Sequence, residues 1–324
     1  EVFLARNESE PLQLALRSGA NVDDVTVEIE QPTADDGSRL PNPEVHRVGF
    51  VPIDHPTSYF RSESPPWHRK FPTSPGHCDG WAGFWPDPLL PMAPFRLVAE
   101  ETQPIWITFR SPPDAAPGEY RGSVKIKSHG KTLAEMPHTV RVWDFELPKK
   151  RNLIAIYDVR PGKPWFEKGE KREDVVRAMM RFLSERRLCA DHVPAQPVFK
   201  REGDRVTADF GAFDSAAQWY FDELSMPVAY FPQFFYLFGW AHPPKKILGE
   251  EPYEGGFPYE GKDRSKLRAE YVRIYQAALR LFWDHLKSKG WSDKMVLYIS
   301  DEPHFSHEHV RAQMRALCEM IHGV

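Results

Sequence analysis

Cysteine is scarce in this sequence of 324 residues, and long apolar runs are missing. The three cysteines, Cys78, Cys189 and Cys318, lie far apart and form no CxxC pair, which argues against a disulfide framework or a zinc knuckle. The most apolar stretch, residues 231–240, is interrupted by a proline and a glutamine and falls short of the roughly 18 residues that a membrane span needs. The sequence therefore predicts no membrane-spanning segment.

A block of charge of one sign is also missing. Lys and Arg number 42, Asp and Glu number 46, and no long run of either sign occurs, so no nucleic-acid partner is predicted. No glycine-rich phosphate loop follows the first apolar segment after residue 151, where Asp158-Val159-Arg160-Pro161-Gly162 stands instead. This absence disfavours a nucleotide-binding fold, and no cofactor is predicted.

Residues 1–150 show the alternation of apolar and polar residues that is typical of strands. The alternating apolar positions include Val25, Val27, Ile29, Ile105, Ile107, Phe109, Tyr120, Val124, Ile126, Val140 and Val142. Turn signals such as Pro117-Gly118 separate them, so we expect an antiparallel β-sandwich domain. Ten prolines fall within residues 52–94, which is too dense for regular strands and predicts an ordered insertion.

Residues 151–324 alternate apolar strand-like segments with helical stripes, which predicts a second domain with a parallel sheet. The predicted strands are 153–159, 188–193, 227–231 and 295–300. Asp214, Asp263 and Ser306 are predicted to begin helices, and Gly290 to end one. Right-handed crossovers allow an open sheet or a closed barrel, and the missing phosphate loop favours a (β/α)8 TIM-type barrel. Four strand–helix units fit before Val324, so the barrel is expected to be truncated.

The most informative motif is the last predicted strand, which ends in Asp301-Glu302-Pro303. Catalytic groups of parallel barrels lie at the C-terminal ends of strands. Two neighbouring carboxylates repel each other, so one can carry a proton while the other stays ionised. Side chains of consecutive strand residues point in opposite directions, which places this pair poorly for a direct double displacement.

The chain resembles glycoside hydrolase family 123 over essentially its whole length. The resemblance rests on Leu4-Ala5-Arg6-Asn7-Glu8, Trp85-Pro86-Asp87-Pro88-Leu89, Pro104-Ile105-Trp106, Pro117-Gly118-Glu119-Tyr120-Arg121-Gly122 and the pair Asp301-Glu302. It implies a β-sandwich followed by a (β/α)8 barrel, and removal of terminal β-linked N-acetylhexosamine, in particular N-acetylgalactosamine, from a glycan or glycolipid. It also favours a secreted or periplasmic location.

The resemblance implies a substrate-assisted retaining mechanism. The 2-acetamido oxygen of the substrate attacks C1, Glu302 protonates the leaving oxygen, and Asp301 orients the acetamide. Further substrate-binding candidates, chosen by position near the strand ends, are Asp158, His192, Tyr236, Trp240 and His242.

Three alternatives remain open. Many barrel glycosidases carry Asn-Glu-Pro at the end of a strand, and Asp301-Glu302-Pro303 differs from that motif by one residue. In this alternative, Glu302 would be the acid/base and a later strand would carry the nucleophile. The chain could also be a non-catalytic carbohydrate-binding homologue. His304, His307 and His309 with Asp301 could form a metal site, although solvated histidines at a helix start explain them more simply, and no metal is predicted.

Overall fold

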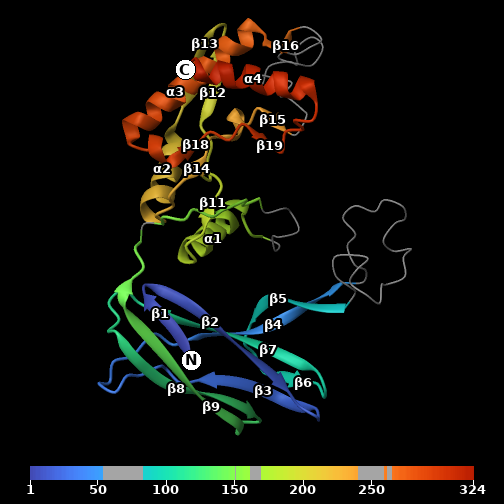
Figure 1. Ribbon diagram of the computed structural model, residues 1–324, viewed down its shortest axis with the longest axis vertical. Coiled ribbons are helices and arrows are strands. Elements are labelled where there is room, and N and C mark those ends of the chain that lie inside the picture. Colours follow the sequence, from blue (N-terminus) through green and yellow to red (C-terminus); the bar gives the residue numbers. More distant parts are fainter. Residues whose placement is uncertain (54–82, 150, 161–168, 240–258, 261–264) are drawn as a thin grey trace, which may run out of the picture. The chain divides into compact units, whose positions relative to one another are not determined.

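The computed structural model describes residues 1–53, 83–149, 151–160, 169–239, 259–260 and 265–324 (Figure 1). They form two compact units, Glu1–Pro148 and Lys149–Val324. Within the described residues, no helix is both long and apolar enough to cross a membrane.

The first unit consists of two β-sheets around one core (Figure 1). One sheet has the order β1 (Val2–Arg6), β9 (Lys131–Glu146), β8 (Gly118–Ser128), β3 (Val22–Ile29) and β6 (Phe95–Leu97), and the other has β2 (Glu8–Arg17), β7 (Thr102–Ser111), β4 (Glu44–Ile53) and β5 (Gly83–Pro91). Ile105, Ile107 and Phe109 of β7 are buried at every second position. They face Val25, Val27 and the other apolar side chains of the first sheet in a single cluster. The predicted sandwich is therefore present.

The sandwich differs from the prediction in one pairing, because β1 runs parallel to β9. The hydrogen bonds extend past the end of β9, where the Leu147 N–H donates to the Arg6 carbonyl at 2.9 Å. The Asn7 side chain donates to the Leu147 carbonyl at 2.8 Å. All other strand pairs of this unit are antiparallel among the described residues.

The proline-rich window contains a regular strand, which the prediction excluded. Trp85, Pro86 and Pro88 belong to β5, which pairs with β4 and has no strand on its other side in the described sheet. Proline cannot donate a backbone hydrogen bond, and an edge strand tolerates it because one side of the ladder is unpaired. Trp67 and Trp81 lie outside the described residues.

The second unit is built on short parallel strands. Their order is β10 (Ile156–Tyr157), β11 (Cys189–Ala190), β14 (Ala229–Tyr230) and β18 (Met295–Val296), where a bridge between His192 and Tyr230 joins β11 to β14. β15 (Phe238–Gly239) continues beside β19 (Ser300–Asp301), also in parallel. The described strands form a half-barrel sheet, so the predicted (β/α)8 barrel, expected to be truncated, is observed only in part.

Among the described residues, four α-helices follow these strands in the order that the alternation predicts. They are α1 (Arg172–Glu185), α2 (Gly211–Gln218), α3 (Ala269–Lys289) and α4 (Glu308–His322). Two antiparallel pairs, β12 (Val198–Glu202) with β13 (Arg205–Asp209) and β16 (Tyr259–Glu260) with β17 (Lys266–Leu267), are insertions. Short helices are η4 (Trp219–Glu223), η5 (Gln233–Phe235) and η7 (Ser292–Lys294).

The predicted end of a helix at Gly290 is confirmed, whereas the predicted helix starts at Ser306 and Asp214 are wrong. Gly290 ends α3 with a left-handed φ of 71°, which glycine adopts without strain. Ser306 does not cap α4, because His307 occupies that position without a side-chain bond. Asp214 lies inside the first turn of α2, where its carboxylate binds His285 and Lys289 of α3 at 2.6 Å each. Asp263 lies outside the described residues.

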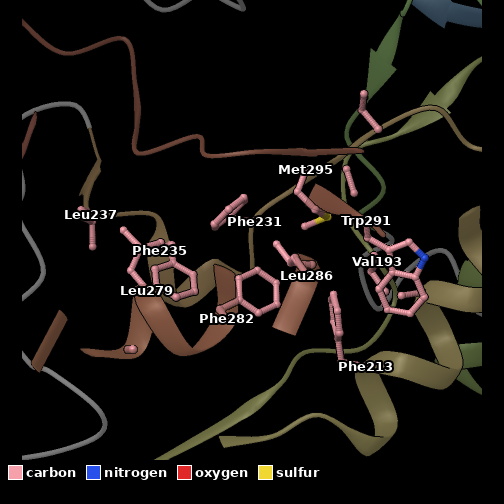
Figure 2. Close-up of a cluster of buried hydrophobic side chains, with 14 of the residues drawn as sticks. Val193, Phe213, Phe231, Phe235, Leu237, Leu279, Phe282, Leu286, Trp291 and Met295 are labelled. Carbon is pink, nitrogen blue, oxygen red and sulfur yellow. The ribbon is translucent and has the colours of Figure 1, made fainter. Parts of the chain in front are cut away.

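An aromatic core joins the helices to the strands of the second unit. Phe282 of α3 is fully buried, and its ring lies 5.2–5.7 Å from those of Phe213, Phe231 and Phe235 (Figure 2). Phe231 directly follows β14, and its N–H donates to the Val296 carbonyl at 2.9 Å. The packing of Phe282 therefore fixes the position of the strand ends that form the cavity described next.

Candidate functional site

A cavity of about 660 Å³ opens beyond the C-terminal ends of the parallel strands. Asp158 follows β10, Asp191 follows β11, and Tyr230 ends β14. Because parallel strands all present the same end to one edge of the sheet, these side chains converge. The complete lining is Ile156, Asp158, Val159, Arg160, Arg172, Asp191, His192, Gln196, Tyr230, Phe231, Gln233, Tyr236, Tyr298 and Asp301.

Asp191 and His192 form a close pair in this cavity. His192 Nδ1 lies 2.6 Å from Asp191 Oδ1, which also accepts the Val159 N–H at 3.1 Å. Burial alone would raise the pKa of Asp191, but the hydrogen bond and charge of His192 and the Val159 N–H outweigh it, so the pKa lies below its usual range. Asp191 is therefore a buried carboxylate at neutral pH.

Asp158 lies on the exposed side of the same cavity, with its Oδ1 2.7 Å from Arg160 Nε. Partial burial and the neighbouring charge of Asp191 raise its pKa, although Arg160 and His192 act in the opposite direction. The two carboxyl groups interact directly, and their pKa values move apart. Such divergence between neighbouring acids is typical of catalytic sites.

Asp301 is held by a tyrosine from its own chain segment. Tyr298 donates its hydroxyl hydrogen to Asp301 Oδ1 at 2.7 Å. The Tyr298 ring stacks on Tyr230 with centroids 4.6 Å apart and leans on Tyr236 at 5.8 Å. Burial and the bond to Asp301 raise the pKa of Tyr298, so its hydroxyl stays protonated and remains a donor at neutral pH.

Glu302 differs from Asp301 in its surroundings. It is exposed, and its side chain does not contribute to the lining of the cavity. Its backbone adopts a left-handed φ of 43°, which costs a non-glycine residue on the order of 1–3 kcal/mol and is frequent at functional sites. The residue thus lies one position beyond a carboxylate that lines the cavity, and it does not line the cavity itself.

The remaining candidates divide into those near the cavity and those outside the described residues. His192, Asp158 and Tyr236 line it together with Asp301. Trp240 and His242 lie outside the described residues. The ring centroids of His304 and His307 lie 6.4 Å apart, and those of His307 and His309 lie 5.4 Å apart. The described residues contain no group of three or more His, Cys, Asp or Glu placed to hold a metal ion.

Sequence reasoning missed Asp191, Tyr230 and Tyr298. Asp191 follows the apolar Cys189-Ala190 as Asp158 follows Ile156-Tyr157, and this repeated strand-end aspartate was the available signal. Tyr298 was assigned to a continuous buried strand. The structure instead breaks that strand after Val296, and the tyrosine lines the cavity.

Comparison with known proteins identifies a relationship to one family. Residues 6–128 match the profile of the glycoside hydrolase 123 N-terminal domain. The fold resembles that of a family 123 glycoside hydrolase from Clostridium perfringens, described in a study of glycolipid glycan hydrolysis, with a TM-score of 0.65 at 14% identity. The match covers 99% of this chain and 56% of that one, so this chain spans just over half of its length. The resemblance to family 123 is confirmed.

Two other solved structures share less with this chain. A Bacteroides ovatus GH5 xyloglucanase matches with a TM-score of 0.25 and 7% identity, over 98% of this chain and 59% of that one. Self-complemented MyfA, the fimbrial subunit from Yersinia enterocolitica, matches with a TM-score of 0.23 and 9% identity, over 45% and 92%. At these scores neither likeness extends to the fold. No curated protein matches the sequence.

Proposed function

We propose that this chain contributes the active site of a retaining exo-glycoside hydrolase that releases a terminal β-linked N-acetylhexosamine. The observation that carries this proposal is Asp301, a carboxylate at the end of a parallel strand, held by Tyr298 inside a cavity walled by three tyrosines. Concave sites that combine aromatic walls with a few fixed polar groups are typical of small-ligand pockets. The flat faces of the tyrosines suit the C–H faces of a pyranose.

Asp301 is placed to hold the substrate's acetamide group. Tyr298 occupies Oδ1, and among the described residues no hydrogen bond engages Oδ2. A carboxylate only accepts hydrogen bonds, so Oδ2 can take the acetamide N–H. The acetamide oxygen is then directed at C1, and the Asp301 charge stabilises the oxazolinium-like intermediate. Substrate assistance of this kind replaces the second carboxylate of the usual retaining scheme.

Glu302 is the proposed general acid. The leaving oxygen joins the bound terminal sugar to the rest of the glycan, and it therefore lies at the mouth of the cavity. An exposed carboxyl group next in sequence to Asp301, which lines the cavity, is suited to protonate that oxygen. Asp158 is the competing donor, because it lines the cavity and its pKa is raised by burial and by Asp191.

Leaving-group dependence separates these two acids. Glu302→Gln should retain activity on aryl glycosides with activated leaving groups and lose about 10²–10⁴-fold on oligosaccharides, the usual range for general acid catalysis. Asp158→Asn should lower activity on both substrate classes by similar factors. If Asp158→Asn instead shows the selective loss, Glu302 is not the acid.

The acetamide requirement tests the mechanism. Nitrophenyl glycosides of N-acetylgalactosamine should be cleaved, N-trifluoroacetyl analogues should react more slowly because their carbonyl oxygen is a weaker nucleophile, and 2-hydroxy analogues should not react. Equal cleavage of the 2-hydroxy sugars would favour a carboxylate nucleophile from another strand. Binding without any release would favour a non-catalytic homologue.

The proposed substrates are the ends of glycans or glycolipids. The family 123 neighbour from Clostridium perfringens is associated with glycolipid glycan hydrolysis, and this chain shares its fold. N-acetylgalactosamine is the proposed terminal sugar. Release of N-acetylglucosamine at an equal rate from matched substrates would contradict a preference at C4.

A further inference from the structure

The backbone around Asp191 and His192 fixes both residues in the sheet. The Asp191 carbonyl accepts the Tyr230 N–H at 2.6 Å, and His192 forms a parallel bridge with Tyr230. Both residues line the cavity, but the Asp191 side chain is only 7% exposed, whereas that of His192 is 30% exposed. The imidazole is therefore the more accessible part of the pair.

The protonation of the pair follows from its surroundings. Burial raises the pKa of Asp191, but His192 and the Val159 N–H lower it by more, so the net shift is downward. The carboxyl group is therefore ionised and can only accept hydrogen bonds. His192 Nδ1 must then carry the hydrogen of the 2.6 Å contact. The charged groups Asp158, Arg160, Arg172 and Asp301 also line the cavity.

Nε2 is the ring nitrogen that remains for a ligand. Among the described residues, no hydrogen bond engages it. In a neutral ring with hydrogen on Nδ1, Nε2 accepts a hydrogen bond, and in a charged ring it donates one. A sugar hydroxyl can do both, so it satisfies Nε2 in either state.

We propose that Asp191 is a positioning residue that holds His192 with Nδ1 protonated, so that Nε2 binds one hydroxyl group of the terminal sugar. The identity of the ligand rests on the proposed function, whereas the role of Asp191 does not. A carboxylate that accepts the Nδ1 hydrogen of a functional histidine, and so fixes its tautomer and orientation, is a recurring arrangement in enzymes.

The first experiment measures the tautomer without substrate. ¹⁵N-labelled histidine is introduced, the ring signals of His192 are identified by their loss in His192→Gln, and NMR is recorded above pH 8. The wild-type protein should show hydrogen on Nδ1. Asp191→Asn should raise the share of the Nε2–H form, because an amide can donate to Nδ1. Asp301→Asn removes one charge from the same cavity and should leave the His192 tautomer unchanged.

Two results would overturn the role of Asp191. One is an Nε2–H tautomer in the wild-type protein, and the other is an Asp191→Asn variant that is folded and keeps the wild-type tautomer. Circular dichroism and the thermal midpoint establish that each variant is folded. Neither result depends on catalysis.

The second experiment identifies the hydroxyl group. Affinities of N-acetylgalactosamine and its 3-, 4- and 6-deoxy analogues are measured by calorimetry with wild-type protein and with His192→Ala. For the wild-type protein, one deoxy sugar should bind about fivefold more weakly than the parent sugar, since a hydrogen bond contributes about 1 kcal/mol and about 1.4 kcal/mol corresponds to tenfold. For His192→Ala, that deoxy sugar and the parent sugar should bind equally well. The same penalty in both proteins would refute the contact with His192. If no N-acetylhexosamine binds, the proposed function fails, and the NMR result still decides the role of Asp191.

Discussion

Removing one oxygen atom from Tyr298 should reduce turnover by about tenfold. Phenylalanine at this position keeps the ring that stacks on Tyr230 at 4.6 Å and removes only the hydroxyl group that donates to Asp301 Oδ1 at 2.7 Å. A hydrogen bond to a charged group contributes about 1.5–3 kcal/mol, and Asp301 is exposed, which places this bond at the lower end. A loss of about 1.5 kcal/mol corresponds to roughly tenfold in rate.

The assay is kcat and KM on a nitrophenyl N-acetylgalactosaminide with the natural full-length protein. Because Asp301 acts on the acetamide as it attacks, the loss should appear mainly in kcat. In an Asp301→Asn background, Tyr298→Phe should have little further effect, since its partner has lost the charge. Tyr157→Phe, at an exposed tyrosine that does not line the cavity, is the matched control. A folded Tyr298→Phe protein within twofold of wild type, or an equal loss in the Asp301→Asn background, would refute the reasoning.

Two further predictions concern stability. Phe282→Ala removes a fully buried ring whose centroid lies 5.2–6.2 Å from those of four other phenylalanine rings. It should lower the free energy of unfolding of the second unit by about 3–5 kcal/mol, measured by urea denaturation, and Phe282→Leu should cost clearly less. Equal losses for both would mean that the site collapses around alanine. Burial raises the pKa of Asp214, but the hydrogen bonds from Lys289 and His285 lower it by more, so the net shift is downward. The unfolded chain then binds more protons, and this stabilisation, complete above about pH 4, should be lost as pH falls through the lower folded value. Urea midpoints at pH 5 and pH 3 should therefore differ more for wild type than for Asp214→Asn, and equal differences would contradict the role of this carboxylate.

The pattern of the sequence predicts the sandwich well, because burial on one face of a strand imposes a period of two. Ile105, Ile107 and Phe109 are buried as that period requires. The parallel pairing of β1 with β9 could not be predicted in this way, since it joins segments far apart in sequence and leaves no local signal. Regular strands in the proline-rich window were excluded because proline weakens a ladder, yet an unpaired edge removes that penalty for β5.

Residues of the candidate site could be predicted where a titratable side chain lies at the end of a predicted strand. Asp158, His192 and Asp301 were placed by that rule, and all three line the cavity. Tyr298 was missed because an apolar run of six residues reads as one strand, whereas the structure has two short strands with the tyrosine between them. Asp191 was missed because its importance lies in a contact with His192, and the sequence shows adjacency but not the direction of a side chain.

The pairing of β1 with β9 also sets an order of events during synthesis. Asn7 and Leu147, which close this pairing with a hydrogen bond, are separated by 140 residues. The ribosome produces β1 before β9, so β1 lacks its complete partner strand until residue 146 has been made. Contacts over such sequence distances form slowly, and an unpaired strand invites association with other chains. The first unit is therefore most vulnerable to aggregation on the ribosome, and chaperone binding should be concentrated in the interval before β9 emerges.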